Sequence, residues 1–289
     1  FKEEEIPVAD RSEMDQWILS ELNRLIETVD KAYNEYEPTK AARAISEFVQ
    51  EILSNWYVRL SRRRFWKGDY QEDKIAAYQT LFECLLSTAK LMAPIAPFYA
   101  DQLYRDLCAA TGVESFESVH LAEFPVPKSA VRQPELEDQM QKARTIASLA
   151  LSLRKKEQIK VRQPLQKIMI PVRNAAEKTA IEKVQDLILS ELNVKELELL
   201  DDASDILVKE IKPNFKTLGP RFGKNMKAVV GHIHQLEDEQ IKALENEASV
   251  TLELDGEKVE LLPTDVIIQS KDIEGWLVAN GNGLTFAFD

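Results

Sequence analysis

The chain has 289 residues, of which 44% are hydrophobic and 30% are charged. This composition is typical of folded domains and excludes a largely disordered chain, and the length is sufficient for two domains that each bury a core. The formal net charge of −12 argues against a protein that binds nucleic acid over its whole surface.

The two cysteines, Cys84 and Cys108, lie within apolar helical patterns. A disulfide framework or a cysteine zinc site needs more cysteines or closer ones, so we interpret both as core residues of a reducing compartment. The longest apolar run is interrupted by a lysine and two prolines, which excludes a membrane span by sequence. The chain starts Phe1-Lys2-Glu3, without an initiator Met or a signal peptide, and we interpret it as an internal piece of a longer protein.

The first 110 residues predict helices throughout. Ser12, with Asp15 three residues later, is typical of a helix N-cap. The apolar residues from Met14 to Tyr33 then recur on one helical face, and Pro38 begins a second helix. Further helices are predicted over 72–92 and, after Pro94 and Pro97, to about Leu107. Long helices with short connections predict an antiparallel bundle.

Within this bundle, the residues from 59 to 67 form a concentrated basic segment. Its five cations are Arg59, Arg62, Arg63, Arg64 and Lys67. No acidic residue occurs between Glu51 and Asp69, and aromatic residues, Trp66 among them, are interleaved with the cations. Guanidinium groups neutralise phosphates and stack on bases, and aromatic rings offer bases a stacking surface. The segment therefore predicts contact with RNA.

A purely structural interpretation of the same segment stays open. Apolar residues from Ala42 to Leu60 recur at spacings of three and one, which predicts a long amphipathic helix with Trp56 and Tyr57 in the core. The arginines would then occupy its last turns, where cations complement the negative end of the helix dipole, and Gly68 would end the helix.

The second half of the chain predicts a mixed structure. After a connecting stretch from Thr111 to Pro134, helices are expected over 136–157 and 175–192. Strands are expected over 167–172, 194–200 and 206–212, and hairpins over 250–262 and 276–288. We therefore predict two domains, an all-α antiparallel helix bundle over residues 1–130 and an α+β domain over 131–289.

Two more basic segments lie in this half. Residues 154–167 and 207–230 each carry a net charge of +5, as does 59–67, so the remaining residues together carry −27. Such segregation would confine phosphate contact to selected surfaces. Ordinary solvated charge explains the two later segments equally well.

No catalytic constellation is found. The run from Gly219 to Lys224 has too few residues between its glycines for a phosphate-binding P-loop, and Asn225 stands where Ser or Thr should be, so a backbone turn or a basic loop is the better interpretation. His232 and His234 have no third ligand nearby for a metal. No nucleophile has an evident base partner, so the chain by itself predicts a binding module.

Three motifs together resemble a known family. Ser54-Asn55-Trp56-Tyr57-Val58-Arg59 with Arg62 to Trp66, Leu91-Met92-Ala93-Pro94 to Phe98 with Asp101 to Tyr104, and Ser118 to Pro125 resemble the anticodon-binding helical domain of class I aminoacyl-tRNA synthetases of the isoleucyl, valyl and leucyl group. They also come in the order of that family.

Two later motifs narrow the resemblance. The segments from Lys160 to Leu165 and from Lys212 to Lys224 are similar to the C-terminal region of isoleucyl-tRNA synthetases of the type shared by eukaryotes and some bacteria. No heptad run suggests the coiled-coil arm of valyl enzymes. The HIGH and KMSKS signatures of the catalytic domain, an editing domain and the cysteine-rich zinc element do not occur in the sequence.

The resemblance implies that the parent protein is a ligase that charges tRNA with isoleucine using ATP and magnesium, while this part is non-catalytic, holds no cofactor and recognises tRNA. Its implied partners are isoleucine tRNA and the catalytic and editing domains of the same chain, in a monomeric cytoplasmic protein without membrane contact. The implied tRNA-binding residues are Arg59, Arg62, Arg63, Arg64, Trp66 and Lys67 on the bundle, and Lys160, Arg162, Lys216, Arg221 and Lys224 on the α+β part. A valyl-type fragment, a free-standing RNA-binding protein and a protein-docking module are the alternatives.

Overall fold

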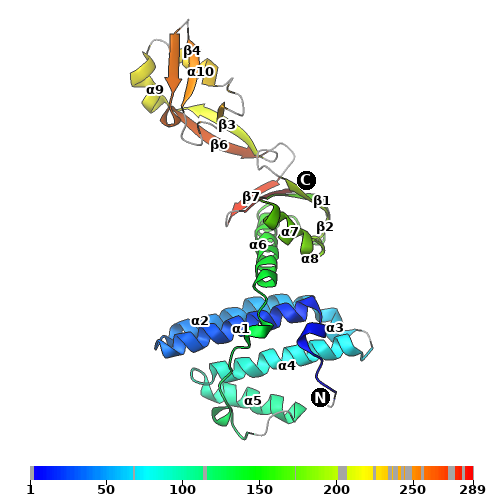
Figure 1. Ribbon diagram of the computed structural model, residues 1–289. Coiled ribbons are helices and arrows are strands. Elements are labelled where there is room, and N and C mark those ends of the chain that lie inside the picture. The colour runs from blue at the N-terminus through cyan, green and yellow to red at the C-terminus, as the bar shows by residue number, and fades with distance from the viewer. Residues whose placement is uncertain are drawn as a thin grey trace. The chain divides into compact units, whose positions relative to one another are not determined.

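The computed structural model describes residues 3–67, 69–112, 116–172, 174–200, 207–223, 226–233, 236, 240–241, 244, 249–254, 257–272, 277–281 and 284–288 (Figure 1). The chain forms two compact units, residues 1–140 and 141–289. The boundary falls within a helix, α6 (Pro134–Lys156), whereas the sequence places it at residue 130. The first unit is a helix bundle and the second combines helices with small sheets, which confirms the predicted fold class.

The helices of the first unit follow one another with short connections, as the sequence predicts. They are η1 (Val8–Asp10), α1 (Glu13–Asn34), α2 (Pro38–Glu47), η2 (Phe48–Val58), α3 (Arg62–Trp66), α4 (Glu72–Met92), α5 (Pro97–Thr111), η3 (Val119–Leu121) and η4 (Ser129–Val131). α1 packs against α2, η2 and α4, which places it at the centre of the bundle (Figure 1).

Capping and burial explain why α1 begins where it does. The Ser12 hydroxyl oxygen accepts a hydrogen bond from the Asp15 backbone N–H at 3.3 Å, so the predicted N-cap is confirmed. The apolar face predicted from the sequence lies inside, and Trp17, Ile18 and Val29 are fully buried. Burial of side chains this large contributes about 1.5–3 kcal/mol each, so packing more than helix propensity holds α1 in place.

The helix formed by α2 and η2, which precedes α3, is wider over η2. η2 is a π-helix, in which the Arg59 backbone N–H donates to the Ser54 carbonyl, five residues earlier. Its buried residues are Phe48, Ile52, Leu53 and Tyr57, and their spacing of four to five residues fits this wider turn. The prediction that Trp56 is a core residue is therefore wrong in degree. Trp56 is half-buried, while Tyr57 is fully buried as predicted.

A carboxylate on α5 fixes the segment that closes the bundle. Asp101 accepts hydrogen bonds from the Ser118 hydroxyl at 2.7 Å and from the Val119 backbone N–H at 2.9 Å. Val119 is consequently buried against Ala100 and Tyr104 of α5. These two hydrogen bonds, with the nearby Arg105 guanidinium, hold the pKa of Asp101 below its usual value.

Among the described residues, the second unit contains one four-stranded sheet, two two-stranded sheets and their helices. Its strands are β1 (Leu165–Pro171), β2 (Val194–Leu200), β3 (Leu207–Pro213), β4 (Val250–Leu254), β5 (Glu257–Leu261), β6 (Val266–Asp272), β7 (Leu277–Gly281) and β8 (Leu284–Phe288). Its helices after α6 are α7 (Ala175–Lys183), α8 (Gln185–Leu192), α9 (Phe215–Phe222) and α10 (Met226–Ile233), with the short turn η7 (Pro263–Asp265) before β6.

One sheet has the order β2-β1-β8-β7. β1 runs parallel to β2, and β8 pairs antiparallel with both β1 and β7. α7 and α8 form the crossover between the parallel strands, which is the connection that such a pair requires. The sequence predicts one helix here, but the helix is broken at Val184, whose backbone leaves the helical region (φ −107°, ψ 12°).

In the remainder of this unit, β3 pairs with β6 and β4 pairs with β5. Leu218 of α9, Val229 and Ile233 of α10 and Leu261 of β5 belong to one buried cluster. The sequence does not predict β6 or α9, and it predicts α10 only as a partly exposed helical turn around His232. The interpretation of the 219–224 run as a turn or loop is wrong for the part that lies in α9. The predicted hairpin turns at 255–256 and 282–283 lie outside the described residues.

We predict that Asp101→Asn loosens the closing segment at neutral pH. Because the folded pKa of Asp101 lies below the unfolded value, its charged form contributes stability above about pH 4 and loses it as the pH falls through the folded pKa. Denaturant unfolding at several pH values should show wild type and variant differing at neutral pH and converging in acid. Asp106→Asn on the same helix is the control, and an equal effect of both variants would contradict the assignment.

Candidate nucleic-acid interface

The short helix α3 divides its side chains between the core and the solvent. Phe65 is buried and Arg64 is half-buried, whereas Arg62, Arg63 and Trp66 are exposed. Trp66 keeps 69% of its surface exposed, which is unusual for so large an apolar side chain. We call the exposed set Arg59, Arg62, Arg63, Trp66 and Lys67 the α3 surface.

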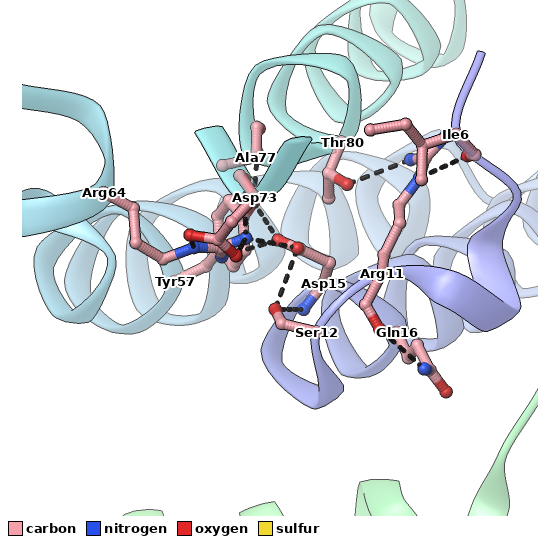
Figure 2. Close-up of polar contacts among 10 residues, drawn as sticks. All are labelled: Ile6, Arg11, Ser12, Asp15, Gln16, Tyr57, Arg64, Asp73, Ala77 and Thr80. Atoms are coloured by element: carbon pink, nitrogen blue, oxygen red, sulfur yellow. Dashed lines mark hydrogen bonds and ion pairs between the residues drawn. The ribbon is translucent and has the colours of Figure 1, made fainter. Parts of the chain in front are cut away.

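Arg64 is held by two carboxylates, the buried one of Asp15 and the exposed one of Asp73 (Figure 2). Its Nη1 and Nη2 atoms donate to the two carboxylate oxygens of Asp15 at 2.9 and 2.6 Å. Its Nε and Nη2 atoms donate to those of Asp73 at 2.9 and 2.7 Å. Burial alone would lower the pKa of the Arg64 guanidinium, but the hydrogen bonds to both carboxylates outweigh it and raise that pKa. Arg64 thus has an internal role, and its contact with RNA stays a prediction.

Asp15 collects further donors around its fully buried carboxylate (Figure 2). The Tyr57 hydroxyl donates at 2.6 Å and the Ser12 hydroxyl donates at 2.8 Å. Burial, and then the negative charge of Asp15, raise the pKa of Tyr57, so the phenol stays a neutral donor. The sequence analysis treats Asp15 only as a capping residue, because pairing with a residue 49 positions away leaves no local signal.

Phe65, the other inward-facing residue of α3, also anchors this helix. Its ring makes edge contact with Tyr57 at 6.2 Å between centroids and a tilted contact with Tyr78 at 5.5 Å. The Tyr78 hydroxyl also donates to the Phe65 carbonyl at 3.1 Å. The neighbouring Arg64 and Phe65 therefore set which way α3 faces.

The outward side of α3 combines cations with an aromatic ring. The Arg62 guanidinium lies 5.6 Å from the centre of the Trp66 ring, which is cation–π geometry. Arg63 and Lys67 are exposed, and neither makes an ion pair with any residue that the structure describes. Arg59 is exposed too, and its Nε donates to the Asn55 carbonyl at 2.7 Å. This arrangement offers positive charge for phosphates beside a ring on which a base can stack.

In the second unit, a buried arginine shapes the turn that carries Lys160 and Arg162. Arg154 of α6 is only 1% exposed. Its Nη1 donates to the carbonyls of Lys160 at 3.2 Å and Gln163 at 3.0 Å, and its Nη2 donates to that of Leu192 at 2.8 Å. Leu192 ends α8, where a cation complements the helix dipole. Burial lowers the pKa of Arg154.

The same turn is held from its other side. Asn193, in a left-handed conformation (φ 51°), donates from its side chain to the Val161 carbonyl at 3.0 Å. The backbone is thus fixed inward, while Lys160, Val161 and Arg162 are exposed. The sequence analysis counts Arg154 only as one charge among several and misses its role. Its helical spacing from the buried Ala147 and Ala150 places it on the inward face of α6, a signal that a count of charges does not use.

The predicted residues of the third basic segment, 207–230, differ in their contacts. Lys216 is exposed on α9. Arg221 is ion-paired with the buried carboxylate of Asp265 and donates to the Glu260 carbonyl at 3.0 Å. Its guanidinium lies 5.0 Å from the centre of the Phe222 ring. Lys224 lies outside the described residues.

No cluster of three or more His, Cys, Asp or Glu side chains suited to a metal ion occurs among the residues with described positions. Of the helices that the structure describes, none is both long and apolar enough to cross a membrane. Cys84 is fully buried, which raises the pKa of its thiol, and Cys108 is half-buried.

Exposed cations beside an exposed tryptophan, as on α3, form the type of surface that contacts single-stranded nucleic acid. In keeping with this, residues 15–169 match the family described as the anticodon-binding domain of tRNA ligases. This match spans more than half of the chain, and the chain therefore belongs to that family.

Individual relatives are similar over the whole chain. It is 53% identical over 289 residues to an isoleucine–tRNA ligase of Bacteroides thetaiotaomicron and 56% identical over 288 residues to one of Porphyromonas gingivalis, covering all of this chain and 25% of each ligase. An isoleucine–tRNA ligase of Thermus thermophilus is 37% identical over 282 residues, with 97% of this chain and 27% of that ligase covered. The chain thus spans about a quarter of the length of these relatives.

We predict that Arg154→Met destabilises the second unit by about 2–4 kcal/mol, because it leaves the buried Leu192 carbonyl and three part-buried carbonyls without this donor. Lys155→Met, at the exposed neighbouring position, makes the same change in charge and serves as the control. Denaturant unfolding followed by amide hydrogen exchange of residues 160–165 measures both effects. Equal stability of the two variants would show that the buried guanidinium does not hold the turn.

Proposed function

We propose that this chain is the tRNA-recognition part of an isoleucine–tRNA ligase and that it binds the anticodon region of isoleucine tRNA. Two observations support the proposal beyond the family itself. The relatives named above are isoleucine–tRNA ligases and are similar along all or nearly all of the chain. The α3 surface places Arg62, Arg63 and Lys67 in solvent around the exposed ring of Trp66, and this observation carries the proposal.

The proposed mechanism is recognition by stacking and charge. An unstacked anticodon base lies on the Trp66 ring, while guanidinium and ammonium groups of the α3 surface neutralise the phosphates that flank it. Base stacking on an aromatic side chain contributes about 1–3 kcal/mol, and phosphate contacts make the affinity dependent on salt. Lys160, Arg162 and Lys216 form the second contact with the tRNA backbone, since all three side chains are exposed.

The remaining roles belong to the ligase as a whole. We propose that ATP, with magnesium, and isoleucine bind a catalytic domain of the same polypeptide, because the HIGH and KMSKS signatures do not occur in this sequence. The role of this chain is then to hold the tRNA so that the acceptor end of the tRNA reaches the catalytic domain. We also propose that the ligase acts as a cytoplasmic monomer.

We predict that Arg62→Ala combined with Arg63→Ala weakens binding to an isoleucine tRNA transcript about tenfold at low salt. Loss of two phosphate contacts should also reduce the slope of log affinity against log salt by about 1.5, because each contact contributes about 0.7–0.9. Filter binding at several salt concentrations measures both quantities.

The matched control is Lys31→Ala combined with Arg43→Ala, which removes two exposed cations of the same unit away from α3. We expect this control to bind nearly as wild type does. An equal loss in both double variants would indicate only a general effect of net charge, and no loss in either would contradict the proposed surface.

A further inference from the structure

We infer that Asp15 is a positioning residue of the α3 surface, so that an RNA-binding face depends on a buried acid that makes no RNA contact. This inference rests on the proposed function. The carboxylate of Asp15 has no exposed surface and lies behind Arg64, on the inner side of α3 (Figure 2).

The short length of α3 makes this helix dependent on tertiary contacts. It contains only five residues, and so short a helix is not stable without tertiary contacts. Its contacts come from Arg64, which joins α3 to the first turns of α1 and α4 through Asp15 and Asp73, and from Phe65. Asp15 is the fully buried member of the two acids, since the side chain of Asp73 is 62% exposed.

The pairing of Asp15 with Arg64 also sets the direction in which α3 faces. A buried carboxylate is tolerated only when it is paired and hydrogen-bonded. Asp15 therefore pairs with Arg64 on the inner side of α3. The forked guanidinium of Arg64 fits the two carboxylate oxygens of Asp15 in one orientation. With about 100° per residue, positions two before and two after Arg64 lie on the opposite side. These positions are Arg62 and Trp66, which form the cation–π pair.

A positioning role and a purely electrostatic role of Asp15 predict opposite changes in RNA affinity. Removing a negative charge from an RNA-binding protein should strengthen binding if only long-range electrostatics mattered. If Asp15 positions α3, its neutral replacement should weaken binding instead, because Arg64 loses its buried partner and the outward cations lose their fixed placement.

The test compares Asp15→Asn with Thr80→Val. Thr80 is fully buried in the same polar layer and accepts a hydrogen bond from Arg11 at 2.9 Å, on the side away from α3 (Figure 2). Binding to the isoleucine tRNA transcript is measured at a temperature where circular dichroism shows all variants folded. We expect Asp15→Asn to weaken binding about three- to tenfold and to reduce the salt slope, with Thr80→Val close to wild type. Binding by Asp15→Asn that equals or exceeds wild type would overturn the inference.

A double-mutant cycle separates positioning from general destabilisation. Adding Arg62→Ala and Arg63→Ala to Asp15→Asn should cost much less affinity than adding them to wild type. Fully additive losses would overturn the inference. If Asp15→Asn does not fold, Arg64→Lys takes its place, because lysine keeps the charge but cannot form the two forks.

Hydrogen exchange of the α3 amides distinguishes the two proposals. Lost protection of residues 62–66 in Asp15→Asn but not in Thr80→Val is expected. If wild-type chain bound no tRNA, the proposed function would fail, while this difference in protection would still establish that Asp15 positions α3. Unchanged protection in Asp15→Asn would reject the positioning role whether or not tRNA binds.

Discussion

The ion pair between Arg64 and the buried Asp15 is the interaction on which the rest of the bundle surface depends. This ion pair joins α3 to α1, and a second ion pair of Arg64, with Asp73, joins α3 to α4. Isolated ion pairs are weak evidence of stability, because desolvation offsets much of the attraction. Their better-attested value is specificity, since an acid that is fully buried must be met by one particular donor. Here that requirement decides which of three successive arginines turns inward.

The same division occurs in each basic segment of the chain. Arg154 is buried against carbonyl groups while Lys160 and Arg162 are exposed, and Arg221 pairs with Asp265 while Lys216 is exposed. Arg64 and Arg154 are withdrawn from solvent while their basic neighbours are exposed, whereas Arg221 pairs with Asp265 but is itself exposed. A count of cations in the sequence therefore overestimates the charge available to a phosphate backbone, and the exposed members define a smaller surface.

Much of the fold could be predicted from local patterns, and the site only in part. α4 and β2 have the predicted bounds because apolar periodicity, with Pro94 just beyond α4, is a local signal. The π-helical turn that moves Trp56 outward, the break at Val184 and helix α9, which contains Gly219 and Pro220, follow from tertiary packing that overrides local preference. For the site, composition indicated the segment from 59 to 67. The separation of Arg64 from Arg62 and Arg63 required knowledge of Asp15, which lies far away in the sequence.

The central claim is that the outward side of α3 meets the anticodon loop. The most direct measurement replaces Trp66 with a photoreactive benzoylphenylalanine and maps the covalent adduct formed with an isoleucine tRNA transcript under ultraviolet light. Tyr36, which is 93% exposed elsewhere on the bundle, carries the same probe as the control. The account predicts an adduct from position 66 within the anticodon loop and little or none from position 36. An adduct from position 66 that maps outside the anticodon region, or none at all while tRNA is bound, would contradict it.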